Sequence, residues 1–167
     1  FVTSKWGDQI AYSQKNIPAK EDAGWKSLPN GIKLKEPSTI PKFQQLDFTY
    51  FQSIIDIPKN TKPNKLTISF EFVDDGARVY IFNSKYPKGT YKKGTDFVLD
   101  TWHNLKPRPD KTIGNFADLL VTGKNRIVIV QFDNSSTGNH IEGVSMIADA
   151  NEIPVSTKTV KEMETVK

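Results

Sequence analysis

The chain has 167 residues, of which 37% are hydrophobic and 25% charged, with a formal net charge of +4. This length can bury one core, so we expect a single domain over residues 1–154 and a short C-terminal extension over 155–167. The sequence contains no cysteine, which excludes disulfide bonds and thiolate metal sites. No apolar run is long enough to cross a membrane as a helix, so we expect no membrane insertion.

The positive charge does not by itself indicate a nucleic-acid partner, because the basic residues are nearly all lysines scattered among acids. Arginine, whose planar guanidinium reads phosphates and guanine edges, occurs only at Arg78, Arg108 and Arg126. The densest basic cluster is interleaved with Tyr86 and Tyr91 and consists of Lys85, Lys88, Lys92 and Lys93. This pattern occurs in single-strand binders and also in solvated loops. Because no nucleic-acid motif accompanies it, we expect no nucleic-acid partner.

The pattern along the chain is that of an all-β domain: short runs rich in Ile, Val, Phe, Tyr and Thr, separated by Pro, Gly and Asn. Residues 1–46 are rich in proline, which predicts a less regular segment that adds an early strand and covers a sheet edge. The predicted strands are Gln9 to Ser13, Phe48 to Ile57, Lys65 to Phe72, Ala77 to Asn83, Arg126 to Phe132 and Glu142 to Ala148. Residues 113–120 are expected to form a short helical turn.

The sequence between the third and fourth predicted strands has the composition of a tight turn. Leu66, Ile68, Phe70 and Phe72 alternate along one face of the third strand. Asp74-Asp75-Gly76 follows, and Asp-Gly is a strong hairpin signal. We therefore predict that the chain reverses at these three residues and resumes as a strand at Ala77.

Two segments resemble galactose-binding-like and protective-antigen-like β-sandwich domains. The first is Val73-Asp74-Asp75-Gly76-Ala77-Arg78-Val79-Tyr80, and the second is Ala117-Asp118-Leu119-Leu120 followed by Gly123-Lys124-Asn125 and an apolar strand. The resemblance extends over roughly residues 47–149. It implies an antiparallel β-sandwich of the jelly-roll type, in which the Gly-Lys-Asn turn precedes a central strand. It also implies a role in carbohydrate binding or adhesion outside the cell.

Asp74 and Asp75 are candidate metal ligands, because adjacent carboxylates repel each other and a hard cation relieves the repulsion. In some proteins of the resembled class such a pair holds calcium, whose remaining sites take sugar hydroxyls. The same resemblance implies a second, oxygen-rich loop, for which Asp133 to Asn139 is the candidate, with Asp133 and Asn134 as further ligands. The alternative interpretation is purely structural, with Asp74 and Asp75 supplying only the geometry of a hairpin.

Aromatic residues in the long segment from Ser84 to Lys111 form a candidate carbohydrate site. Sugar rings stack on aromatic faces while nearby polar side chains bind their hydroxyls. The candidate ligand-binding residues are Tyr86, Tyr91, Trp102 and Asn139. Tyr91, flanked by Lys92, is expected to be exposed, whereas Trp102 has the alternative role of covering the core.

Catalytic motifs are absent from the sequence. The two histidines, His103 and His140, cannot build a three-histidine zinc site, and there is no nucleophile elbow or phosphate-binding glycine loop.

The start, Phe1 to Trp6, lacks an initiator Met and a signal peptide's apolar region, as a processed end or a trimmed chain would.

Two classes of function remain. The first is a secreted or cell-surface binding module that is not an enzyme, with calcium as its one candidate cofactor and a carbohydrate or cell-surface glycan as partner. The second is a structural subunit of a surface filament, sheath or appendage, which self-assembles through its termini and strand edges. Val160, Met163 and Val166, spaced three residues apart in the C-terminal extension, favour contact with a neighbouring subunit.

Overall fold

A computed structural model describes residues 13–27, 33–39, 47–70, 72–92, 97–100, 111–113, 115–133, 140–142 and 145–152. Within these residues the fold is almost entirely β-structure. The strands are β1 (Lys26–Ser27), β2 (Lys33–Thr39), β3 (Asp47–Ile57), β4 (Thr61–Phe70), β5 (Phe72–Phe82), β6 (Phe97–Asp100), β7 (Lys111–Ile113), β8 (Gly123–Asp133), β9 (His140–Glu142) and β10 (Ser145–Glu152). One helical turn occupies residues 13–15, and a 3-10 helix, η2, spans Ala117–Leu119.

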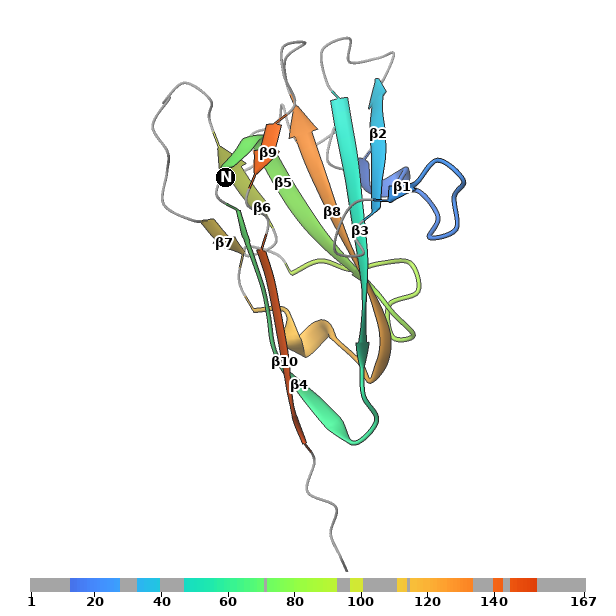
Figure 1. Cartoon of the computed structure of the whole chain (residues 1–167), viewed down its shortest axis with the longest axis vertical. Coiled ribbons are helices and arrows are strands. Elements are labelled where there is room, and N and C mark those ends of the chain that lie inside the picture. Colours follow the sequence, from blue (N-terminus) through green and yellow to red (C-terminus); the bar gives the residue numbers. More distant parts are fainter. Residues whose placement is uncertain are drawn as a thin grey trace, which may run out of the picture.

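The strands form two antiparallel sheets. The large sheet has the order β1-β2-β3-β8-β5-β6, with β9 also paired to β5, and the small sheet has the order β10-β4-β7. Figure 1 shows β10 and β4 side by side in one layer, and β3, β8 and β5 in the other. The fold is therefore an all-β sandwich, as the sequence predicts, and β8 is central, because it pairs with β3 on one side and β5 on the other.

The main core lies between the two sheets. Alternate residues of β4, Leu66 and Ile68, are fully buried and belong to one apolar cluster with residues of the large sheet. The other buried members are Ile57, Ala77, Val79, Ile81, Phe116, Leu120, Ile127 and Ile129. The period-2 pattern of each strand supplies one apolar face to this core.

A second apolar cluster lies on the outer face of the large sheet. It contains Tyr50, Tyr80, Val128, Val130 and Phe132, all buried. Ile17 and Trp25 of the segment 13–27 pack against this cluster, and the Tyr50 hydroxyl donates a hydrogen bond to the Ser13 carbonyl (3.2 Å). β8 is thus apolar on both faces from Ile127 to Val130, because each face is covered there.

The predicted turn at Asp74-Asp75-Gly76 is wrong. These residues lie inside β5, which runs without interruption from Phe72 to Phe82. Gly76 is paired with Phe132 of β8 and with Leu99 of β6. Asp75 is paired with β6 and Asp74 with β9, so partner strands hold a turn-like sequence in an extended conformation, because tertiary pairing overrides local preference.

Several predicted boundaries are also corrected. The segment from Ser84 to Lys111 is not one long loop, since it contains β6 and the first residue of β7. The strand predicted at Glu142 to Ala148 is divided between β9 and β10, and Ser13 begins a helical turn rather than ending a strand. The helical turn predicted over 113–120 is restricted to η2. The C-terminal extension 155–167 lies outside the described residues.

Candidate functional site

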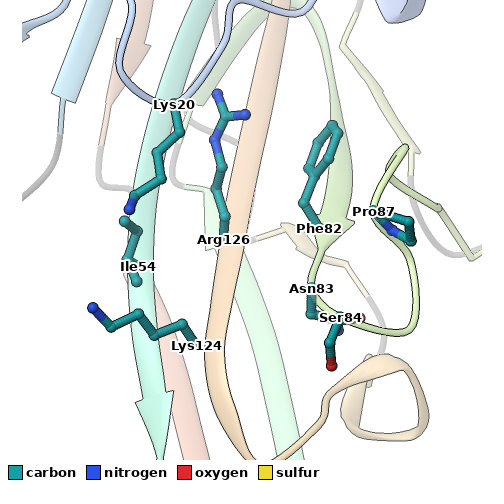
Figure 2. A pocket seen from close by; sticks show the side chains of 8 residues that line it. All are labelled: Lys20, Ile54, Phe82, Asn83, Ser84, Pro87, Lys124 and Arg126. Atoms are coloured by element: carbon teal, nitrogen blue, oxygen red, sulfur yellow. The ribbon is translucent and has the colours of Figure 1, made fainter.

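A groove opens on the outer face of the large sheet, beyond the part covered by residues 13–27. Its floor includes a row across three strands, because Arg126 of β8 is paired with Ile54 of β3 on one side and with Phe82 of β5 on the other. The cavity volume is about 320 Å³. Its lining consists of Lys20, Ile54, Phe82, Asn83, Ser84, Pro87, Lys124 and Arg126 (Figure 2).

Arg126 joins the sheet to the covering segment. Its Nε donates to Gln52 Oε1 (2.7 Å) and its Nη2 to the Pro18 carbonyl (2.7 Å). Its guanidinium carbon lies 5.1 Å from the centroid of the Phe82 ring and 5.8 Å from that of Trp25. Burial lowers the pKa of the guanidinium below its usual value, and the charge of Glu21 opposes this shift. Arg126 is thus a partly desolvated cation, held mainly by neutral groups.

Two lysines carry further positive charge into the groove. In Figure 2 the side chains of Lys20 and Lys124 flank Ile54, one on each side. Lys20 pairs with Glu21 at 3.1 Å, and both side chains are largely exposed, so this ion pair contributes little to stability. The ammonium group of Lys124 makes no hydrogen bond or ion pair with the part of the chain that the structure describes.

The opposite wall of the groove is fixed by two buried asparagines. The Asn83 side chain accepts hydrogen bonds from the amides of Lys85 and Tyr86 (both 3.0 Å) and donates to the Leu119 carbonyl and to Asn125 Oδ1. The Asn125 side chain in turn accepts a hydrogen bond from the Val121 amide and donates to the carbonyls of Val121 and Gly123. Every donor and acceptor of the two amides is used, which holds the turn at Ser84 in one position.

Gly89 and Gly123 offer a test of how the groove wall is supported, because both have positive φ (+83° and +87°). A Cβ at Gly89 would meet the Phe82 ring at 2.6 Å, whereas nothing lies within 4 Å of one at Gly123. Gly123→Ala is expected to lower the free energy of unfolding by about 1 kcal/mol through backbone strain alone. Gly89→Ala should cost about 2 kcal/mol, because the Phe82 ring must also leave its rotamer. Urea denaturation measures both, and equal losses would contradict this account.

The predicted aromatic site is only partly described. Tyr86 is half-buried, and Lys85 Nζ lies 5.1 Å from its ring centroid. Tyr91 is also half-buried, so its predicted exposure is wrong. Its ring packs edge-on against Tyr80 (6.0 Å) and lies 3.8 Å from the Arg78 guanidinium carbon. Neither tyrosine lines the groove, and Trp102 and Asn139 lie outside the described residues.

The predicted calcium ligands have a described backbone at three of four positions. Asp74 and Asp75 lie in β5 and Asp133 ends β8, while Asn134 lies outside the described residues. Asp133 is paired with Asp47, and Asp75 with Asp100. Asp75 and Asp133 directly adjoin the paired residues Gly76 and Phe132. The register therefore aligns the backbones of four aspartates, Asp47, Asp133, Asp75 and Asp100, at one end of the large sheet.

If calcium binds at these aspartates, we expect it to raise the melting temperature. A ligand that binds only the folded state at 100 times its Kd contributes about 2.7 kcal/mol, which corresponds to about 5 to 10 °C for a domain of this size. Magnesium should have a smaller effect, because it demands a stricter geometry. Thermal melts in calcium, magnesium and chelator measure this, with Asp75→Asn as the variant expected to lose the response. Identical curves in calcium and chelator would contradict the metal hypothesis.

Sequence reasoning missed the groove, although one signal pointed to it. Lys124 and Arg126 continue the same face of β8 as the buried residues Val128, Val130 and Phe132. Two cations at successive positions of this otherwise apolar face indicate where residues 13–27 stop covering the sheet and the face becomes exposed to solvent. Their partners, Lys20 and Ser84, come from distant parts of the chain and carry no local signal.

No family model and no curated protein matches the chain. Among solved structures it is similar to Bifidobacterium dentium β-glucuronidase complexed with coumarin-3-O-glucuronide, with 11% identity and a TM-score of 0.33. The match covers 50% of this chain and 11% of that one, and we draw no functional conclusion from it. In the described residues no helix is long and apolar enough to cross a membrane. Among the side chains that the structure describes, which do not include those of the four aligned aspartates, no group of three or more His, Cys, Asp or Glu could hold a metal.

Proposed function

We propose that this protein is a non-catalytic extracellular binding module whose ligand is a carbohydrate, and that the ligand lies in the groove over β3, β8 and β5. The observation that carries the proposal is the composition of the groove, which combines apolar contact surface with groups that bind hydroxyls. Its volume of about 320 Å³ is at the lower end of the range for small-molecule sites, which fits one or two sugar rings.

Apolar and polar residues occur together along the groove: Ile54 lies beside Lys20 and Lys124, and Phe82 and Pro87 lie with Asn83 and Ser84 on the other side (Figure 2). Ile54, Phe82 and Pro87 offer apolar contacts suited to the C–H face of a pyranose ring. Ser84 is exposed and offers its hydroxyl to a sugar, whereas the Asn83 amide is fully used within the asparagine network and fixes the turn. A rigid wall reduces the conformational entropy that the protein loses on binding. This strengthens the binding of a ligand such as a sugar, whose individual contacts are weak.

Binding is proposed rather than hydrolysis because of the lining residues. Glycosidic cleavage generally uses a pair of carboxylic side chains, and the eight residues that line the groove include neither a carboxylate nor a histidine. A galactose-binding-like ancestry, with calcium at the aspartate-rich end of the sheet, remains part of the proposal. It is supported by the two-sheet sandwich and by the central position of β8.

The proposal is tested with two exposed isoleucines on opposite sheets. Ile54 lies in the groove and is 41% exposed, and Ile147 lies on β10 and is 51% exposed. A glycan array first identifies a saccharide that the wild type binds. Ile54→Ala should then weaken that binding by about fivefold, the loss of roughly 1 kcal/mol of apolar contact, whereas Ile147→Ala should not. An array without any bound saccharide, or equal affinities for both variants, would contradict the proposal.

A second candidate function is that of an assembly subunit, which the exposed β10 favours. β10 pairs with β4 along its full length of 8 residues, and on the described residues it has no partner on its other side. Such an edge offers unpaired backbone groups to a strand of another chain. Ile147 adds an exposed apolar side chain at the same edge.

Light scattering on size-exclusion fractions separates the two candidates. An assembly subunit should form oligomers at high concentration, and Ile147→Lys should return it to a monomer without changing its β-type circular dichroism. A wild-type protein that stays monomeric at high concentration would remove support for the assembly function. The same experiment on a chain lacking residues 155–167 tests whether the extension takes part.

A further inference from the structure

We infer that the groove recognises an anionic saccharide, one that bears a carboxylate or a sulfate on the ring. The inference rests on the proposed function and narrows its ligand class. It comes from the charges around the groove, where three of the eight lining residues, Lys20, Lys124 and Arg126, are cationic and none is acidic.

Lys124 is the cation best placed to bind a ligand. Its side chain is exposed, it lines the groove, and its ammonium group is unpaired within the described chain. The nearest acid by register is Asp56, which stands directly opposite Lys124 on β3. The two side chains are not within ion-pair distance, so the ammonium group keeps its three donors for a ligand.

Arg126 supplies a fixed positive charge at the floor. Nε and one Nη2 hydrogen are engaged by Gln52 and Pro18, which orients the guanidinium and leaves further N–H donors. An arginine side chain that is already ordered loses little conformational entropy when it binds an anion. Because the guanidinium is partly desolvated, it attracts the anion more strongly than it would in bulk water. Its position between Ile54 and Phe82 places this charge beside the apolar surface that a sugar ring would contact.

Two neighbouring acids reduce the positive potential and provide an internal control. Glu21 pairs with Lys20, and Asp56 lies opposite Lys124, but neither lines the groove. Removing either carboxylate should therefore strengthen binding of an anionic sugar. Removing a groove cation should weaken it.

The experiment compares matched saccharides by calorimetry. The probes are an α-1,4-linked galacturonate trisaccharide, its methyl ester, a sulfated galactose disaccharide and its unsulfated form. The acidic forms should bind about tenfold more tightly than their neutral counterparts, as expected for one charge-assisted hydrogen bond. Raising the salt to about 1 M should reduce this advantage, because the Debye length falls to about 3 Å. The uronate and sulfate arms decide which acidic group is preferred.

The variants then locate the effect. Lys124→Gln should remove most of the tenfold advantage, and Asp56→Asn should increase it. Lys62→Gln makes the same change in net charge on β4 of the other sheet and should have no effect. Thermal melts establish that each variant is folded.

Neutral and acidic sugars that bind equally well would overturn this inference and leave the carbohydrate function intact. Equal losses in Lys124→Gln and Lys62→Gln would also overturn it, since net charge alone would then account for the binding. Failure of every probe, together with a blank glycan array, would overturn the inference and the proposed function together.

Discussion

Phe116→Ala is expected to lower the free energy of unfolding by about 4 kcal/mol, the usual cost of removing a fully buried Phe ring from a core. Phe116 has no exposed surface and belongs to the cluster between the two sheets. Its amide also donates to the Leu66 carbonyl (2.9 Å), which ties the segment before η2 to the small sheet. Deleting the ring leaves a cavity between the two sheets. Neither sheet can move to fill it, because the backbone hydrogen bonds between its strands fix their positions.

The measurement is chemical denaturation monitored by circular dichroism. Leu119→Ala, three residues along the same segment, is the matched control, because Leu119 is only half-buried and packs at the margin of the same cluster. Its loss should be about 1 to 2 kcal/mol. Similar losses for the two variants would show that Phe116 does not hold the sheets together.

The strands that have a neighbouring strand on each side and a strong apolar pattern were predictable from the sequence. β3 differs from its predicted range by a single residue, and β8 contains its predicted range and extends it at both ends. Both strands lie in the middle of the large sheet, where Val, Ile, Phe and Tyr satisfy local preference and burial at once. In such strands the local and the tertiary preferences agree.

β5 shows why the rest could not be predicted. Asp74-Asp75-Gly76 has turn composition, and its extended backbone is explained by pairing with three other strands: Asp74 with β9, Asp75 with β6, and Gly76 with both β6 and β8. No local pattern reveals that β6, more than twenty residues later in the chain, returns to pair with Gly76. Tyr91 was mispredicted for the same reason, since its contacts with Arg78 and Tyr80 depend on where the chain returns after β5.

The groove has the same origin, since it is assembled from four separate parts of the chain. Lys20 lies in the covering segment, Ile54 in β3, residues 82–87 at the end of β5 and the turn after it, and Lys124 in β8. A sequence motif reports neighbours along one segment, whereas this site depends on strand register. The Gly123-Lys124-Asn125 segment was identified from its resemblance to a turn before a central strand. Its part in the groove follows only from the structure.

The second large effect is expected at Asn125, where Asn125→Ala should lower the free energy of unfolding by about 3 kcal/mol. Asn125 is fully buried, and its side chain makes four hydrogen bonds, with both backbone groups of Val121, the Gly123 carbonyl and Asn83. Alanine would leave the buried Asn83 amide and the half-buried backbone groups of Val121 and Gly123 without these hydrogen bonds, which costs more than the bonds themselves contribute.

The same substitution should also reach the groove, because Asn83 would lose one of the bonds that fix the turn at Ser84. We therefore expect the variant to bind saccharide several-fold more weakly when affinity is measured at a temperature below its melting point. This loss of affinity is in addition to the loss of stability. Asn151→Ala is the control, since Asn151 is exposed and accepts one hydrogen bond from Asn64 (2.7 Å), so its cost should be about 0.5 kcal/mol. Denaturation and calorimetry on the two variants measure both effects. A destabilised Asn125→Ala protein that binds saccharide with unchanged affinity would show that the asparagine network supports the fold alone and that the groove wall does not depend on it.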